Sequence, residues 1–270
     1  MDTRSYCRVW GRHETAAVDQ IARCFPMSHA ERPHEWQRGF AADVSHELRT
    51  PLAGLRAQLE EARLHPDQTE LPVLLSSTLR DLDRLETLVA DLGLLAEAEA
   101  GTSAGWERVD LGELVRGELP HLSGRRTVRA RLESGALIDA VPSHLRRVVG
   151  NLLDNALRHA ESAVLVRVRR GDDGAELTVE DDGPGIAEQD RCWIFQAFTR
   201  LDAARGRDQG GTGLGLSLVG AIVTAHGGNV QVGRSNLGGA RFTVRFPPAG
   251  SSPRRPGTDA HRPEEGSRSC

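Results

Sequence analysis

A histidine, a glutamate and a threonine lie within five residues of one another in the stretch SHELRTPL, residues 45–52. His46 and Thr50 are four residues apart, so a helix places them on one face, with Glu47 at its flank. A neutral imidazole is a good nucleophile near pH 7. A neighbouring carboxylate can hold its N–H and leave the lone pair of the other ring nitrogen available. The stretch therefore combines a nucleophile with a general base.

The stretch NLLDNALRHA, residues 151–160, has the side chains that a phosphate-bound cation requires. Asn151 and Asn155 lie one helical turn apart, with Arg158 and His159 nearby. An asparagine carbonyl suits a hard cation such as Mg²⁺, and an arginine suits phosphate. Taken alone, the stretch is equally typical of a solvated polar helix face.

Two glycine-containing stretches complete a possible nucleotide site. In EDDGPGI, residues 180–186, Asp181 can accept a hydrogen bond from an exocyclic amine, and the glycines let a flat base come close. In GGTGLGLSLV, residues 210–219, backbone N–H groups and a helix N-terminus favour anionic oxygens. The second stretch is not a Walker loop, because it has no GK[ST]. Each stretch alone also fits an ordinary turn or a flexible loop.

Two long helices are expected to position the histidine. Apolar residues recur every three or four positions from Glu35 to Leu64, and again at heptad spacing up to about Ala98, with a polar turn at 65–72. The heptad seam consists of Leu75, Leu82, Val89 and Ala96, with Leu85 and Leu92 between them. Two antiparallel helices cannot bury both apolar faces as a pair, so a dimeric four-helix bundle is predicted. A plain coiled-coil scaffold explains the seams equally well.

The remaining chain alternates strands and helices after the linker AGTSAG, residues 100–105. Strand patterns cover 126–133, 163–170, 175–181, 229–234 and 239–247, and helical patterns cover 143–160 and 212–228. Ser143 is the expected N-cap of the first of these helices. The alternation predicts an α/β sandwich. Residues 193–209, aromatic and then charged, are interpreted as a lid anchored by Phe195 and Phe198.

With these surroundings, SHELRTPL resembles the phosphoacceptor box of sensor histidine kinases. The order of the four stretches, with the predicted lid before the last of them, is similar to the phosphoacceptor, N, G1, F and G2 boxes of those kinases, and the last four boxes are shared with the wider GHKL (Bergerat) ATPases. The resemblance covers residues 35–248 and implies an α-helical hairpin followed by an ATP-binding sandwich. It implies that His46 is autophosphorylated, that Glu47 assists the transfer, and that Thr50 positions water for dephosphorylation of the partner.

The same resemblance implies the nucleotide contacts. Asn155 is expected to ligate Mg²⁺ near the phosphates of ATP, with Asn151 beside it, and Asp181 to bind the adenine amine. The other implied contacts are Arg158, His159, Gly183, Gly185, Ile186, Phe198, Arg200, Gly211, Thr212, Gly213, Leu214, Gly215 and Leu216. Other GHKL ATPases have a glutamate base where Asn151 stands. Its absence here fits transfer to His46 in place of hydrolysis.

The domain boundaries predicted from these patterns begin with residues 1–34, where VDQIARCFPM resembles a degraded HAMP-like linker with Pro26 in place of asparagine. The phosphotransfer hairpin covers 35–100 and a linker 101–106. The ATP-binding domain covers 107–248, and a tail rich in proline, serine and arginine, 249–270, is expected to be disordered.

The resulting hypothesis is an ATP-dependent protein-histidine kinase of a two-component system, acting as a homodimer and passing its phosphoryl group to an aspartate of a response-regulator receiver domain. The alternatives are a GHKL serine kinase or ATPase, and a catalytically silent scaffold that pairs with another kinase. A net charge of −4 does not favour a nucleic-acid surface. No apolar run is long enough to span a bilayer, so a cytoplasmic location is expected, or membrane association if the natural chain extends upstream.

Overall fold

The computed structural model describes residues 34–100, 105–121, 126–199 and 213–251. The HAMP-like segment predicted for residues 1–34 therefore lies almost wholly outside the described residues, as does residue range 252–270 of the predicted tail. Within the described residues, no helix combines the length and the apolar character needed to cross a membrane.

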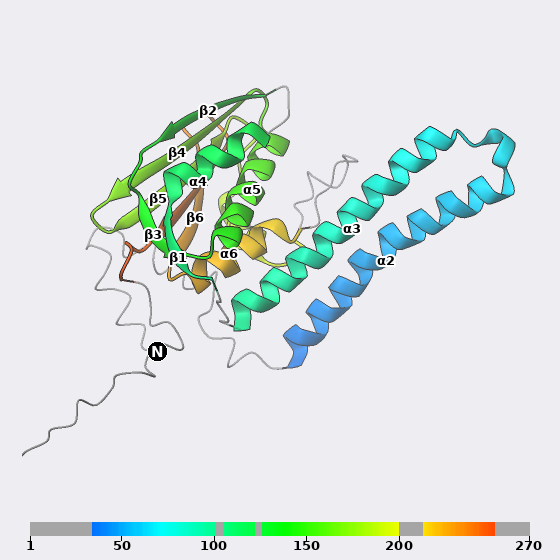
Figure 1. Cartoon of the computed structure of the whole chain (residues 1–270), viewed down its shortest axis with the longest axis horizontal. Coiled ribbons are helices and arrows are strands. Elements are labelled where there is room, and N and C mark those ends of the chain that lie inside the picture. The colour runs from blue at the N-terminus through cyan, green and yellow to red at the C-terminus, as the bar shows by residue number, and fades with distance from the viewer. Residues whose placement is uncertain (1–33, 101–104, 122–125, 200–212, 252–270) are drawn as a thin grey trace, which may run out of the picture.

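Two long helices form an extended hairpin, as the apolar periodicity predicts (Figure 1). Helix α2 runs from His34 to Leu64 and continues through Pro51, and helix α3 runs from Leu71 to Ala100. A 3-10 turn at Pro66–Gln68 joins them. A hydrogen bond from Gln58 Nε2 to Asp81 Oδ2 (3.3 Å) crosses between the helices.

The apolar seams of the hairpin divide into a covered and an uncovered part. Leu55 and Leu88 are buried, at 7% and 2% exposure. The seam residues Leu75, Leu82 and Val89 are 52%, 44% and 60% exposed in the single chain. A pair of helices thus leaves a large apolar surface in contact with water, which a globular protein ordinarily covers.

The second region is an α/β sandwich built on a five-stranded mixed sheet of strand order β2-β4-β5-β7-β6. Its strands are β2 (Thr127–Leu132), β4 (Ala163–Gly171), β5 (Gly174–Asp181), β7 (Ala240–Phe246) and β6 (Asn229–Arg234). Strands β2 and β4 are parallel, and the other neighbours are antiparallel. A separate two-stranded sheet pairs β1 (Glu107–Asp110) with β3 (Leu137–Ala140).

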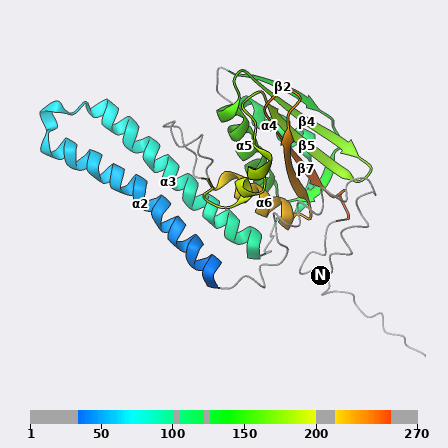
Figure 2. The ribbon, with the colours of Figure 1, turned by 180° about the vertical axis from the view of Figure 1, so that it is seen from behind.

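Helices cover one face of the main sheet and lie between that face and the hairpin (Figures 1 and 2). They are α4 (Leu111–Glu118), α5 (Pro142–His159) and α6 (Gly215–Ala225). Buried residues alternate along β7, and the inward-facing Phe242 and Phe246 are completely covered. One apolar core joins these side chains to Leu145 and Leu152 of α5 and Ile222 of α6. This core fixes the relative positions of α5, β5 and α6.

Three expectations about this region are wrong. The N-cap of α5 is Val141 and not Ser143, because Pro142 occupies the first helical turn, where its missing N–H leaves no donor unpaired. Helix α6 spans Gly215–Ala225, which is shorter than 212–228. The segment 249–251, placed in a disordered tail, is held to β3: Ala249 N donates to Leu137 O (3.2 Å) and Gly250 N to Asp139 Oδ2 (2.7 Å).

The end of α3 is packed into the sandwich. Leu95 of α3 is 6% exposed and belongs to the same apolar core as α5 and α6. Nearby, the buried carboxylate of Asp91 accepts a hydrogen bond from Arg147 Nε of α5 (2.6 Å). Burial raises the pKa of the Asp91 carboxyl, and the Arg147 guanidinium opposes that shift. An apolar contact and an ion pair thus tie the hairpin to α5.

A cluster of rings lies at the same junction, around His226 at the end of α6. Its Nε2 accepts a hydrogen bond from Val141 N (3.2 Å), so Nδ1 carries the proton and donates to Ile222 O (2.8 Å). Trp106 stacks on the imidazole at a centroid distance of 4.7 Å, and His144 meets it edge-on at 5.6 Å. Burial, with a smaller contribution from His144, lowers the pKa of His226 to about 4.

Removing the guanidinium of Arg147 leaves the Asp91 carboxylate buried without its partner. We expect Arg147→Ala to lower the free energy of unfolding by about 3 kcal/mol, measured by denaturant titration. The control is the neighbouring Arg146, whose Nε lies 3.6 Å from Glu118 Oε1 at an exposed site. Arg146→Ala should change the free energy by less than about 1 kcal/mol. Equal effects of the two variants would contradict the assignment.

Protonation of His226 should destabilise the fold. Its folded-state pKa lies below the unfolded value of 6.5, so its stabilising contribution is complete above pH 6.5 and is lost as the pH falls toward 4. The loss reaches about 3 kcal/mol, and His226→Gln, which can still accept from Val141 N, should remove most of it. Thermal unfolding between pH 4 and 7 measures the slope, with the exposed His65→Gln as control. An unchanged slope in His226→Gln would contradict the prediction.

Candidate active site

The histidine of the phosphoacceptor stretch is exposed on α2. Thr50 is also exposed, and its Oγ1 donates to the backbone carbonyl of His46 (3.1 Å), which fixes the threonine side chain one turn below the imidazole. Glu47 is half-buried beside them. The helix therefore presents the His46 imidazole to solvent, where a second reactant can reach it.

Helix α5 places the two asparagines of the nucleotide stretch on one half-buried face. The Nδ2 of Asn151 is completely buried and makes no hydrogen bond among the described residues. A side chain at Gly215, the first residue of α6, would place its Cβ 3.2 Å from Asn151 Oδ1. Arg158 and His159, at the last turn of α5, are exposed. The unpaired amide of Asn151 is a donor available to an anionic ligand.

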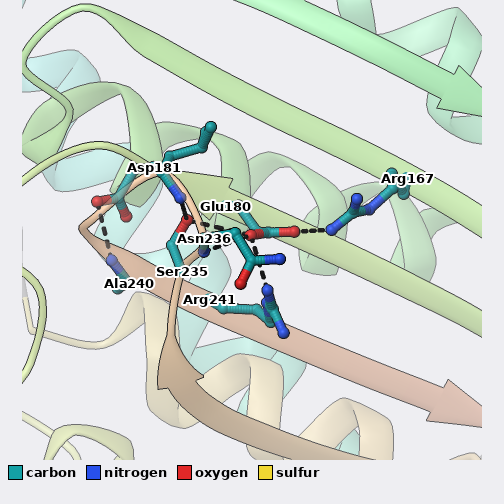
Figure 3. A network of polar contacts seen from close by, with 8 residues as sticks. Arg167, Glu180, Asp181, Ser235, Asn236, Ala240 and Arg241 are labelled. Atoms are coloured by element: carbon teal, nitrogen blue, oxygen red, sulfur yellow. Dashed lines mark hydrogen bonds and ion pairs between the residues drawn. The ribbon is translucent and has the colours of Figure 1, made fainter.

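Asp181 ends β5 and is 1% exposed. Its Oδ1 accepts backbone hydrogen bonds from Gly183 N (2.9 Å) and Ala240 N (3.1 Å), the latter from β7 (Figure 3). These bonds hold one carboxylate oxygen and, among the described contacts, leave the other with no protein donor. Oδ2 can therefore accept a hydrogen bond from a ligand.

Glycine is required beside this carboxylate because the backbone is crowded. A Cβ on Gly183 would lie 2.3 Å from His159 O, and one on Gly239 would lie 2.0 Å from Asp181 Oδ1. Gly185 has a left-handed φ of 75°, and Ile186 packs against the apolar core. The sequence reasoning missed Gly239 and Ala240. The glycine pair in NLGGARF, just before β7, was the available signal.

The residues on either side of the undescribed part of the predicted lid are held together by a hydrogen bond. Phe198 N donates to Gly213 O (3.0 Å), and both residues have left-handed φ values, 62° and 72°. Phe195 is buried and meets Phe242 of the sheet edge-on at 6.4 Å. The predicted contacts Arg200, Gly211 and Thr212 lie between these ends, outside the described residues.

The glycine stretch leads directly into α6, whose N-terminus faces α5 at Asn151. Leu214 is 1% exposed and Leu216 packs against the apolar core, so their side chains anchor the helix. Ser217 Oγ donates to Leu214 O (2.8 Å). The helix start thus offers its backbone N–H groups, and not these leucine side chains, to an anion.

The site therefore brings together an amide pair on α5, a helix N-terminus and a half-satisfied carboxylate at the end of β5. The unpaired amide of Asn151 is a donor that an anionic group can satisfy, and Asp181 Oδ2 is an acceptor without a protein donor among the described contacts. Among the described residues, no group of three or more histidine, cysteine, aspartate or glutamate side chains is arranged to hold a metal ion. This is the arrangement of an ATP-binding domain beside a helical hairpin with an exposed histidine.

Comparison with known families matches both parts of the chain. Residues 36–101 match the His Kinase A (phospho-acceptor) domain, and residues 140–250 match the histidine kinase-, DNA gyrase B- and HSP90-like ATPase family. The chain belongs to the sensor histidine kinases of two-component systems. It spans about half the length of the curated relatives it matches.

Individual relatives agree with this assignment. The sensor protein RstB of Escherichia coli (strain K12) is 38% identical over 210 residues, which cover 76% of this chain and 47% of RstB. The solved Acinetobacter baumannii histidine kinase AdeS has a TM-score of 0.62 at 28% identity, covering 75% of this chain and 97% of that one. Full-length ShkA, solved with AMPPNP, has a TM-score of 0.55 at 30% identity, covering 76% of this chain and 45% of that one.

A side chain at position 239 should displace the Asp181 carboxylate directly. In Gly239→Ala the new Cβ collides with Asp181 Oδ1 and with Gly183 N, at 2.0 and 2.5 Å. We expect ATP affinity, measured by titration calorimetry, to fall at least about tenfold because the carboxylate must turn away. Gly233→Ala on β6, where a Cβ meets nothing within 4 Å, is the control. Unchanged affinity in Gly239→Ala would contradict this geometry.

Proposed function

We propose that this chain is an ATP-dependent protein-histidine kinase that phosphorylates His46 and passes the phosphoryl group to an aspartate of a response-regulator receiver domain. The observation that carries the proposal is the pairing, in one chain, of an exposed histidine in SHELRTPL with residues 140–250, which match an ATPase family. A scaffold has no need of the second, and a simple ATPase has no need of the first.

In this proposal the base and the phosphates are bound by different elements. Asp181 accepts a hydrogen bond from the adenine amine through Oδ2, and the backbone at Gly183 and Gly185, where a side chain would collide with its surroundings, packs beside the carboxylate. Asn151 donates to a phosphate oxygen, which gives its buried Nδ2 a partner. Asn155 holds Mg²⁺ through its carbonyl oxygen, and Arg158 contacts phosphate. Bound Mg²⁺ offsets the negative charge of the phosphates during the transfer.

The proposed reaction moves a phosphoryl group from an oxygen of ATP to a ring nitrogen of His46. A lone pair on the His46 imidazole forms a bond to the γ-phosphorus while the bond from that phosphorus to the bridging oxygen of ADP breaks. Glu47 accepts the proton of the other ring nitrogen, which keeps the imidazole nucleophilic. Position 151 is an asparagine, so no carboxylate base activates water there, and hydrolysis does not compete. Thr50 orients water for a separate reaction, the hydrolysis of the phosphoaspartate on the partner, which releases inorganic phosphate.

We also infer that the chain dimerises through the hairpin. Exposed Leu75, Leu82 and Val89 form a stripe with heptad spacing on α3, and Leu52 and Leu59 of α2 are 54% and 50% exposed. A second copy of the hairpin covers these residues in a four-helix bundle. The uncovered surface of the bundle then docks the receiver domain. Because ATP is the phosphoryl donor, this region is placed in the cytoplasm.

Autophosphorylation tests the proposal. The chain is incubated with Mg²⁺ and γ-labelled ATP, and the label is followed on the protein. We expect incorporation that is stable to base and lost in acid, as a phosphoimidazole requires. His46→Gln should remove it completely, and Asn155→Ala should lower its rate at least about 100-fold by loss of the cation ligand. His65→Gln, an exposed histidine on the connection between α2 and α3, is the control and should label normally.

Other outcomes distinguish the alternatives. Acid-stable label that persists in His46→Gln indicates a serine kinase. Release of labelled inorganic phosphate without label on the protein indicates an ATPase. Failure of the chain to bind ATP indicates a catalytically silent scaffold. Each of these results contradicts the proposed function.

A further inference from the structure

A second buried carboxylate lies next to Asp181 on β5, outside the proposed nucleotide pocket. Glu180 is 1% exposed. Its Oε1 contacts Arg167 of β4, and its Oε2 accepts from Ser235 Oγ (3.1 Å), Asn236 N (3.2 Å) and the Arg241 guanidinium (3.2 Å) (Figure 3). Neighbouring residues of a strand point to opposite faces, so Glu180 cannot reach the base that Asp181 is proposed to bind.

Two of the contacts of Glu180, with Ser235 and Asn236, lie on the turn between β6 and β7, residues 235–239. Within this turn, Ser235 N donates to Gly239 O (2.8 Å) and Gly238 N donates to Ser235 O (3.2 Å). The hydroxyl of Ser235 also accepts from Leu237 N (2.9 Å). The hydroxyl that donates to Glu180 is therefore part of the internal bonding of the turn, and the carboxylate holds the turn at its first two residues.

The far end of the same turn holds Asp181. Gly239 N donates to the Asp181 carbonyl (3.2 Å), and Ala240 N donates to Asp181 Oδ1 (3.1 Å). A Cβ at position 239 would lie only 2.0 Å from that oxygen, so the turn backbone is in tight contact with the carboxylate. A small displacement of the turn must therefore change the direction in which Asp181 Oδ2 points.

We propose that Glu180 is a positioning residue for base recognition: its carboxylate fixes the β6–β7 turn, and the turn in turn orients Asp181 toward the adenine amine. The inference rests on the proposed function, because it takes Asp181 as the group that binds the amine. It adds a residue that touches no part of the nucleotide and yet determines how well adenine is distinguished from guanine. Guanine has a carbonyl where adenine has the amine, and a well-placed carboxylate repels it.

The same strand provides a matched control. Glu176 lies four residues before Glu180 on the same face of β5, and its Oε2 accepts from Arg245 Nε of β7 (2.9 Å). In the described contacts it makes no bond to the β6–β7 turn. Loss of its charge therefore removes one carboxylate–arginine pair from the same sheet without releasing the turn.

The test compares Glu180→Gln with Glu176→Gln in the full chain. Affinities for ATP and for GTP are measured by titration calorimetry with Mg²⁺, and thermal unfolding is followed in parallel. We expect Glu180→Gln to weaken ATP binding about tenfold while GTP binding changes little, so that the preference for ATP falls by about the same factor. Glu176→Gln should change the preference by less than about twofold. A purely structural role of Glu180 would weaken both nucleotides equally.

Two further variants separate the possible failures. Asp181→Asn should abolish the preference for ATP, and if the preference survives, the proposed adenine contact and this inference both fall. If Asp181→Asn abolishes it and a folded Glu180→Gln retains it, only the positioning role is overturned. If Glu180→Gln does not fold, the same comparison of ATP and GTP affinities is made with Ser235→Ala, which removes one contact between Glu180 and the turn. We expect that variant to lower the preference about threefold, and an unchanged preference overturns the proposal.

Discussion

The hydrogen bonds that hold the Asp181 carboxylate are the interaction on which the proposed nucleotide site depends. A carboxylate buried at the end of a strand is costly unless its oxygens are satisfied, and here backbone N–H groups from two different segments satisfy one of them. Because Ala240 belongs to β7, the pairing of β5 with β7 determines the direction in which the Asp181 side chain points. The sheet thus supplies both the position of the carboxylate and one of its partners, and the second oxygen remains for a ligand.

The apolar core determines where the other groups of the site lie. Buried faces of α5 and α6 pack on the same inner face of the sheet, and this brings Asn151 and Gly215 into contact. The core also extends to Leu95 of α3, and the ion pair between Asp91 and Arg147 lies beside it. Any movement of the sandwich relative to the C-terminal end of α3 must break that ion pair and expose part of that core. The contacts near the C-terminal end of α3 therefore impose a free-energy cost on any change in the position of the sandwich relative to the phosphoacceptor helix.

Much of this arrangement follows from local patterns. Periodicities of 3.6 and 2 residues predicted both long helices, the hairpin of β4 and β5, and the closing hairpin of β6 and β7, because each of these elements has its apolar residues on one continuous face. The motif residues on α5, β5 and the start of α6 were predicted from their types and spacing. Their juxtaposition is a property of the sheet order, which no single stretch contains.

What the sequence reasoning missed depends on contacts between distant segments. Gly239 is needed because its backbone touches Asp181, 58 positions earlier in the sequence. Leu95 belongs to the apolar core of the sandwich, so a heptad pattern within the hairpin could not assign its contacts. Ser143 was expected as an N-cap on its side chain alone, whereas Pro142 moves the start of α5 back to Val141. The short elements β1, β3 and α4 carry too few residues to show a period.

The most direct test of the central claim is to locate the transferred phosphorus atom. The chain, labelled with ¹⁵N in its histidine rings, is incubated with ATP and Mg²⁺ and examined by ³¹P and ¹⁵N NMR at neutral pH. Besides the signals of the ADP that is released, the account predicts one new protein-bound phosphorus signal coupled to an imidazole nitrogen, which tandem mass spectrometry of the same sample assigns to His46. Phosphorus bound to a hydroxyl oxygen, or found only as inorganic phosphate, would contradict it.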